Sequence, residues 1–230
     1  MVKTTPLKAV TLTHVRYERG DKLGHLLAWA SLLPVIIGLG GFLSHFIFRR
    51  EMQAMAFGLG LILSEFINEM IKKVVKEARP ITCELLEMCD SHGWPSSHSQ
   101  YMCFFSIYLT LLVLRRFHFT DSFSRNFTAI LPWPFALATI YSRVYLGYHS
   151  VAQVIAGSAV GLTLGSAWFV IVNKYLVKFF PTLEGTYFCR YLCIKDSTHI
   201  PNVLRFEYDN CREARKTAKV RYASTIVHVL

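Results

Sequence analysis

The sequence predicts an all-α protein: a multi-pass integral membrane bundle of about five transmembrane helices. Two observations support this prediction. Of the 230 residues, 53% are hydrophobic and only 17% are charged, whereas soluble domains contain about 25% charged residues. The apolar residues also form long uninterrupted runs, and a helix needs about 20 of them to cross a bilayer. This composition excludes a disordered chain and argues against a soluble domain.

Five apolar runs account for the predicted helices. The first carries no charged side chain until Arg49 and Arg50 end it, and the third ends in the same way at Arg115 and Arg116. The second is the weakest, because charged side chains enter its second half. The predicted spans cover residues 25–48, 52–73, 91–114, 126–142 and 150–172.

The last span contains Gly157, Gly161 and Gly165, which recur every fourth residue. Small residues at this spacing let two helices approach closely within a membrane, although they are also common in any apolar helix. We interpret the three glycines as a helix-packing face and not as a functional site.

The distribution of positive charge predicts the orientation of the bundle. The net charge is +10, and most Lys and Arg residues flank the apolar runs, so we expect a membrane lipid environment and no nucleic acid partner. Fifteen of the 25 Lys and Arg lie on one side, which the positive-inside rule places in the cytoplasm. We therefore predict a lumenal segment over 1–24, a transmembrane core over 25–180 and a cytoplasmic basic tail over 181–230.

Two features outside the spans remain open. Residues 203–222 have the pattern of a basic amphipathic helix, which either lies on the cytoplasmic lipid surface or is simply solvated. Cys83 and Cys89 share a lumenal loop and could form a disulfide if that compartment is oxidising. The cysteines and histidines do not have the spacing of a metal site, so we predict no metal ligand.

Three short motifs place polar residues at the ends of successive spans. The first is Lys72-x6-Arg79-Pro80, at the end of the second span. The second, Pro-Ser-Ser-His over 95–98, opens the third span, and the third motif runs from Ser142-Arg143 to His149. In the predicted topology all three motifs lie on the lumenal face.

This set of side chains suits a phosphate group. Two arginines and a lysine match a dianion, because guanidinium forks bind it bidentately and lysine adds a point charge. Ser96 and Ser97 precede an apolar helix, whose free backbone N–H groups and dipole form an anion site. Of the two histidines, one can attack phosphorus while the other protonates the leaving oxygen. The combination predicts phosphoryl transfer without a cofactor.

The three motifs resemble the type 2 phosphatidic acid phosphatase superfamily, whose pattern is Lys-x6-Arg-Pro, Pro-Ser-Gly-His and Ser-Arg-x5-His-x3-Asp. The resemblance implies a helical membrane phosphatase in which His149 is the nucleophile that forms a phosphohistidine and His98 is the general acid. It also implies a phosphate site at the positions that match the rest of the pattern. These positions are Lys72, Arg79, Ser96, Ser97 and Arg143.

Two positions depart from this pattern. Ser97 stands where the family has glycine, which puts the tight geometry beside the phosphate in question. Gln153 stands where the family has aspartate. A glutamine carbonyl can still accept an Nδ1–H bond and orient the histidine, but being neutral it stabilises a developing imidazolium less. Because both histidines remain, we expect the protein to be active.

The same departures, together with residues 11–15 and 200–208, resemble one branch of the superfamily. The resemblance implies hydrolysis of dolichyl diphosphate to dolichyl phosphate at the lumenal face of the endoplasmic reticulum membrane, which recycles the lipid carrier of N-glycosylation. Two alternatives remain. One is a phosphatase for another lipid phosphate, such as phosphatidate or a sphingoid base phosphate. The other is a non-catalytic protein that binds or transports a lipid phosphate.

Overall fold

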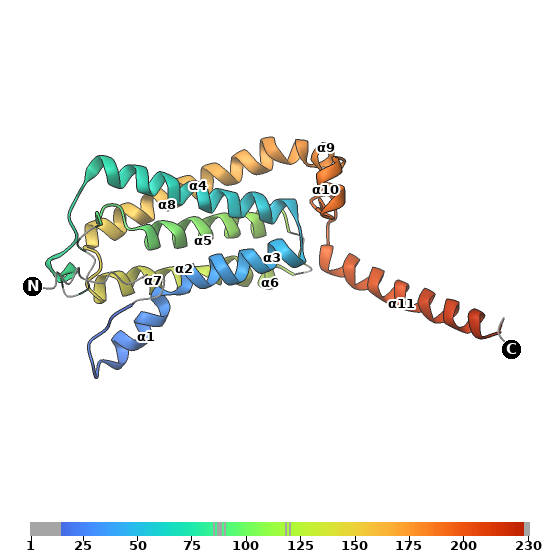
Figure 1. Cartoon of the computed structure of the whole chain (residues 1–230), viewed down its shortest axis with the longest axis horizontal. Coiled ribbons are helices and arrows are strands. Elements are labelled where there is room, and N and C mark those ends of the chain that lie inside the picture. Colours follow the sequence, from blue (N-terminus) through green and yellow to red (C-terminus); the bar gives the residue numbers. More distant parts are fainter. Residues whose placement is uncertain are drawn as a thin grey trace, which may run out of the picture.

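The computed structural model describes residues 15–227 except 85, 87, 88, 90, 118 and 120, and describes side chains up to residue 218. Within these residues the regular structure is helical, apart from one isolated bridge between Glu51 and Lys195. The long helices that precede residue 185 lie side by side in one bundle (Figure 1). The all-α prediction is confirmed. Most of the predicted lumenal segment 1–24 lies outside the described residues.

The first predicted span is one apolar helical stretch that bends. It runs from Lys22 to Phe48 and changes direction near Pro34, which lacks the N–H that would continue the helical ladder. The carbonyl of Ala30, one turn earlier, accepts a hydrogen bond from Thr139 Oγ1 at 3.0 Å instead. Figure 1 shows the first segment leaning away from the others. The segments are α1 (Lys22–Ser31), α2 (Leu33–Val35), the π-helical η1 (Ile36–Phe42) and α3 (Leu43–Phe48).

The second predicted span is the single helix α4 (Met52–Val75), which ends where Lys76 adopts a left-handed conformation with φ 53°. A buried polar network joins α4 to the next helix. Asn68 Nδ2 donates to Gln100 Oε1 at 2.7 Å, and Gln100 Nε2 donates to the Ser64 carbonyl at 2.6 Å. These hydrogen bonds fix the position of the two helices relative to each other along the bundle axis, close to the predicted site.

The third and fourth predicted spans differ from the structure at their ends. The third is α5 (Ser97–Arg115), so residues 91–96 form a loop and not the first turns of the span. The fourth consists of two helices, because Pro132 begins a new one and cannot continue the previous ladder. These are α6 (Ser122–Ile130) and α7 (Pro132–Tyr145). A short 3₁₀ turn, η2 (Ile81–Cys83), lies in the loop between α4 and α5.

The fifth predicted span is longer than expected. It begins as α8 (Val151–Val170) and continues without interruption to Glu184. The helix predicted over 203–222 is present and projects away from the bundle (Figure 1); its contact with lipid stays a prediction. The remaining elements are η3 (Ile171–Tyr175), η4 (Leu176–Phe179), α9 (Phe180–Glu184), α10 (Tyr187–Tyr191) and α11 (Val203–Val227).

Among the described residues, three helical stretches are long and apolar enough to cross a membrane. They are Lys22–Phe48, Met52–Val75 and Val151–Glu184. Helix α5 and the α6–α7 pair run alongside them in Figure 1. Helix α5 carries buried polar side chains, such as Ser99 and Ser106, which lower its apolar content. The predicted count of five spans therefore stays a prediction.

Helix α8 packs against α5 through the three glycines of its ladder. A Cβ added at Gly157 would collide with the backbone oxygen of Ser96, and one at Gly161 would collide with that of Gln100. The same substitution at Gly165 would crowd the next turn of α5. The interpretation of the ladder as a packing face is confirmed. Because Ser96 is the N-cap of α5, this contact sets the beginning of α5 against α8.

Candidate active site

The three motifs come together at one end of the bundle, where α4 ends, α5 begins and the loop between α7 and α8 runs (Figure 1). Two hydrogen bonds join these elements. Thr82 Oγ1, in the loop after α4, donates to the Gly147 carbonyl at 2.5 Å. The Ser96 backbone N–H donates to the Gln153 carbonyl at 3.0 Å. The loops that carry the motifs are therefore fastened to one another.

His149 lies in the loop before α8 and is 2% exposed. Its Nδ1 is 3.0 Å from the Gly93 carbonyl oxygen and 3.1 Å from Gln153 Oε1. Since both partners are acceptors, Nδ1 carries the proton and Nε2 presents a lone pair. This lone pair accepts a hydrogen bond from Arg79 Nη1 at 3.1 Å. The arrangement holds a neutral imidazole with its free nitrogen facing a cation.

Gln153 is buried with every polar atom of its amide hydrogen-bonded. Besides facing His149, its Oε1 accepts from the Ser150 backbone N–H at 3.2 Å. Its Nε2 donates to Glu77 Oε1 and to the Ala78 carbonyl, both at 2.9 Å. The two backbone partners, one donor and one acceptor, determine which end of the amide is oxygen. An aspartate at this position would lack both donors.

The pKa of His149 is lowered to about 3. The largest cause is burial, because the low-dielectric surroundings disfavour the imidazolium, and the positive charges of Arg79 and Arg143 act in the same direction. The hydrogen bond with Gln153 acts in the opposite direction. The imidazole of the free protein is therefore neutral at physiological pH. A nitrogen nucleophile requires this state.

Arg79 and Arg143 are held by neutral groups. Arg79 Nε donates to Ser91 Oγ at 2.9 Å, and its Nη1 donates to the Tyr148 carbonyl at 3.1 Å. Arg143 Nη1 donates to Ser31 Oγ at 2.6 Å, and its guanidinium lies 4.0 Å from the centre of the Tyr148 ring. Within the described part of the chain, the buried Nε of Arg143 has no hydrogen-bond partner. Both guanidinium groups thus retain their charge for an anion.

The other predicted phosphate-binding residues lie at the beginning of α5 and the end of α4. Ser96 is fully buried, and α5 begins at Ser97 without a side-chain cap, so its first N–H groups can face an anion. Lys72 is buried and pairs with Glu69 at 2.7 Å. Among the described residues, neither Lys72 nor His98 hydrogen-bonds directly to another predicted site residue.

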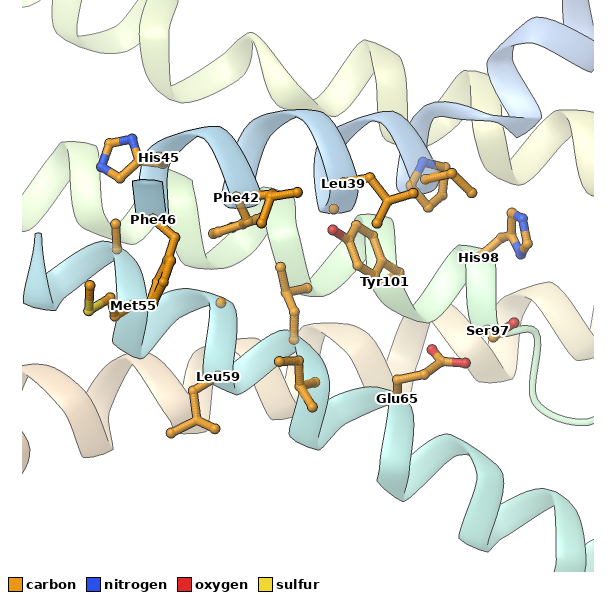
Figure 2. A pocket seen from close by; sticks show the side chains of 18 residues that line it. Leu39, Phe42, His45, Phe46, Met55, Leu59, Glu65, Ser97, His98 and Tyr101 are labelled. Atoms are coloured by element: carbon orange, nitrogen blue, oxygen red, sulfur yellow. The ribbon is translucent and has the colours of Figure 1, made fainter. Parts of the chain in front are cut away.

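An apolar groove with a volume of about 790 Å³ leads away from Ser97 and His98. Figure 2 shows its walls, η1 and α3 on one side and α4 on the other, with His45 at the far end. Two polar side chains enter it near His98. They are Glu65 and Tyr101, whose buried hydroxyl has no partner among the described residues. The groove is therefore apolar along its length and ends at the polar residues of the site.

Four residues of the site were not predicted from the sequence. They are Ser31, Glu77, Gly93 and Tyr148. Ser31 meets Arg143 across a separation of 112 residues, and an isolated serine in an apolar run gives no sign of that contact. Glu77 is one of the six unspecified residues of Lys72-x6-Arg79, and Gly93 lies in the loop that follows, so the motif gives neither of them a role. Only Tyr148, next to His149, could have been proposed from its position.

The loop that carries Arg79 contains a disulfide between Cys83 and Cys89, the pairing that the sequence left open. This bond restricts the segment that follows Arg79 and η2. Within the described residues, no group of three or more His, Cys, Asp or Glu side chains could hold a metal ion.

Comparison with known proteins identifies the family. The PAP2 superfamily pattern matches residues 53–176, which contain all three motifs. The chain belongs to the PAP2 superfamily. The resemblance inferred from the motifs is confirmed.

Several relatives of this PAP2 protein are similar along most of the chain. Lipid phosphate phosphatase gamma of Arabidopsis thaliana is 59% identical, covering 91% of this chain and 93% of its own. Dolichyldiphosphatase 1 of Homo sapiens is 40% identical and covers 90% of each chain. Dolichyldiphosphatase of Saccharomyces cerevisiae is 36% identical over 70% of this chain and 69% of its own. No solved structure matches the chain.

Proposed function

We propose that this PAP2 protein hydrolyses dolichyl diphosphate to dolichyl phosphate and inorganic phosphate through a phosphohistidine intermediate. The observation that carries the proposal is the state of His149: it is protonated on Nδ1, and its Nε2 lone pair faces Arg79. Attack on phosphorus needs that lone pair, and the transferring phosphoryl group needs the adjacent cation. Two relatives named dolichyldiphosphatase support the choice of substrate.

In the first step, the Nε2 lone pair of His149 forms a bond to the terminal phosphorus, and the bond from phosphorus to the bridging oxygen breaks. The electron pair stays on that oxygen, which takes a proton from His98 and leaves as dolichyl phosphate. Arg79 exchanges its bond to Nε2 for one to a phosphate oxygen. Arg143, Lys72 and the first N–H groups of α5 stabilise the remaining charge.

In the second step, water attacks the phosphohistidine and passes a proton to His98. The phosphorus–nitrogen bond breaks, its electron pair returns to Nε2, and inorganic phosphate leaves. Throughout, the Gly93 and Gln153 oxygens hold the Nδ1–H, which keeps the ring in one orientation while it carries positive charge. The product, dolichyl phosphate, is the carrier lipid returned to N-glycosylation.

The apolar groove supports a lipid substrate. With the diphosphate beside His98 and His149, the first part of an isoprenoid chain lies between α3 and α4, along the groove of Figure 2. Its volume of about 790 Å³ falls within the range of sites that bury a small-molecule ligand. Burial of the isoprenoid chain in the groove is favourable, with a free energy of about 25 cal/mol per Å² of apolar surface removed from water.

We also propose that the site faces the lumen of the endoplasmic reticulum. Fifteen of the 25 Lys and Arg residues lie at the ends of the predicted spans opposite the site. This distribution favours a cytoplasmic position for those ends. The disulfide lies on the same side as His149, and disulfides persist in oxidising compartments.

The test is phosphate release from dolichyl diphosphate by detergent-purified protein in EDTA, with His149→Ala and His98→Ala alongside. We expect release by the wild type, none by His149→Ala, and very slow release by His98→Ala. Full turnover by His149→Ala would overturn the mechanism. Lipid binding without release by the wild type would instead support a binding or transport protein.

A second candidate is a phosphatase for another lipid phosphate, because the relative from Arabidopsis thaliana is named lipid phosphate phosphatase gamma. The groups that bind the phosphate do not distinguish phosphatidate from dolichyl diphosphate. Rates measured side by side on dolichyl diphosphate, phosphatidate and sphingosine phosphate decide between them. A higher kcat/KM on either of the last two would replace the first proposal.

A further inference from the structure

The two groups that accept the hydrogen bond from His149 Nδ1–H belong to Gly93 and Gln153. Each of these residues donates a hydrogen bond to Glu77. Along the backbone, the Glu77 carbonyl accepts from the Gly93 N–H at 2.8 Å, and the Gly93 carbonyl lies 3.0 Å from Nδ1. Through its side chain, Glu77 Oε1 accepts from Gln153 Nε2 at 2.9 Å, and Gln153 Oε1 lies 3.1 Å from Nδ1. Glu77 therefore supports the two partners of the nucleophile by separate hydrogen bonds.

The two branches are also packed against each other. A Cβ at Gly93 would collide with the side-chain amide of Gln153, so the amide lies directly on the backbone of the loop. Gln153 is 1% exposed, and the Ala78 carbonyl accepts its second N–H at 2.9 Å. The Gln153 side-chain amide cannot rotate without breaking several hydrogen bonds. A displacement of Glu77 therefore also displaces the amide and the imidazole of His149 that it contacts.

We propose that Glu77 is a positioning residue for His149 and supplies, through the Gln153 amide, the negative charge that a glutamine beside the nucleophile lacks. This inference rests on the proposed function. Hydrogen bonds in series polarise one another. The positive charge that develops on the imidazole during phosphoryl transfer is therefore balanced by a carboxylate two hydrogen bonds away. Glu77 touches neither substrate nor phosphorus in this arrangement.

The pairing explains why a carboxylate next to the nucleophile is unsuitable here. A carboxylate at position 153 would face the Glu77 carboxylate and the Ala78 carbonyl, where Gln153 Nε2 now donates to both. Like charges and unpaired acceptors in a buried position are destabilising. Glutamine at 153 and glutamate at 77 thus function as one unit, with the negative charge at the more exposed position.

A double-mutant cycle on the full-length protein tests the pair, using Glu77→Gln, Gln153→Glu and both together. Glu77→Gln keeps an acceptor for Gln153 but removes the charge, so kcat falls about fivefold to tenfold while KM stays within about twofold. Gln153→Glu brings two carboxylates together and lowers kcat by about 100-fold. In that background, adding Glu77→Gln raises kcat by about tenfold, because the new amide donates to the new carboxylate.

The proposal predicts that Glu77→Gln lowers kcat in the wild-type background and raises it in the Gln153→Glu background. A matched control is Glu84→Gln, which removes the same charge from an exposed residue of the same loop and leaves kcat within about twofold. The acid limb of kcat/KM also moves to higher pH in the double variant, because a carboxylate in direct contact favours the imidazolium. A change in the amount of folded protein alters the apparent kcat but does not move the acid limb, and size-exclusion profiles of all variants check folding.

Two results would overturn the inference: Glu77→Gln behaving like Glu84→Gln, or lowering kcat equally in both backgrounds. Its failure is separable from failure of the proposed function. If the wild type releases phosphate and His149→Ala does not, the function stands while Glu77 loses its role. If the wild type releases none, the proposed function itself fails.

Discussion

Positive charge is held in two different ways at the two ends of the bundle. Near the beginning of α11, Glu207 pairs with Arg49 at 2.7 Å and with Lys195 at 2.8 Å. At the His149 end, Arg79 and Arg143 bond to carbonyl, hydroxyl and aromatic groups, and no described carboxylate pairs with them. Among the described residues, carboxylates neutralise the first set of cations, whereas the two arginines have only neutral partners.

The energetic consequences differ accordingly. Partly exposed ion pairs such as those of Glu207 contribute at most about 1 kcal/mol each. A guanidinium as buried as that of Arg143, 3% exposed, is destabilising without a counter-ion. A fold that retains this unfavourable charge is typical of a functional site.

The largest effect expected from this comparison is on phosphate release. Arg79→Ala removes a cation that faces the nucleophile, so kcat/KM falls by about 100- to 1,000-fold. Arg49→Ala, at the opposite end, changes kcat/KM by no more than about twofold. Steady-state release from dolichyl diphosphate measures both. Equal losses in the two variants would remove the distinction between the ends.

Helix packing gives the next effect. Gly157→Ala pushes α8 away from the Ser96 backbone and shifts the beginning of α5, which lowers the unfolding free energy by about 1–3 kcal/mol and kcat by about tenfold. Gly41→Ala is the matched control, because a Cβ there meets nothing within 4 Å. Thermal melts in detergent and turnover rates test both variants. Unchanged activity in Gly157→Ala would show that this contact does not position the site.

The pH dependence sharpens the comparison further. Removing the positive charge in Arg79→Gln raises the pKa of His149 from about 3 toward its usual value near 6.5. Because protonated His149 cannot attack, the acid limb of kcat/KM moves to higher pH in this variant. Lys195→Gln, at the other end, leaves the limb in place. Profiles of kcat/KM from pH 4 to 8 give the result, and an unmoved limb in Arg79→Gln contradicts it.

The smallest effect concerns orientation. Asn126, in α6, begins an Asn-Phe-Thr sequon on the side predicted to be cytoplasmic, so it receives no glycan. Expression in microsomes, followed by endoglycosidase treatment, leaves the gel mobility unchanged and equal to that of Asn126→Gln. A glycan at Asn126 would place the α6 side of the bundle in the lumen and reverse the proposed orientation.

The sequence predicted the helical class and the motif residues well, because apolar runs and fixed local spacings are visible in one dimension. It placed the beginning of α5 six residues too early, since residues 91–96 are uncharged yet form a loop. It also missed the break between α6 and α7 at Pro132. The break at Pro132 follows from the backbone restriction of proline, which hydropathy does not report. At the third span the motif over residues 95–98 marks the beginning of α5 better than the uncharged run does.

The predicted site lacked its supporting contacts for a different reason. Gln153 was expected to orient His149, and the structure places its Oε1 at 3.1 Å from Nδ1. The contacts of Glu77 and Ser31 join residues 76 and 112 positions apart. Such pairs depend on how the loops and helices pack, and a single sequence contains no spacing that reports them.

The groove between α3 and α4 has a consequence for the direction of the reaction. Its walls follow η1, α3 and α4 along the bundle (Figure 2), and its lining contains neither Arg79 nor Arg143. Under the proposed reaction, the lipid arrives and leaves within the plane of the bilayer, and inorganic phosphate departs into water. The two products thus separate into different phases as soon as they are released. Recombination would require phosphate to return from water to a lipid that stays in the bilayer.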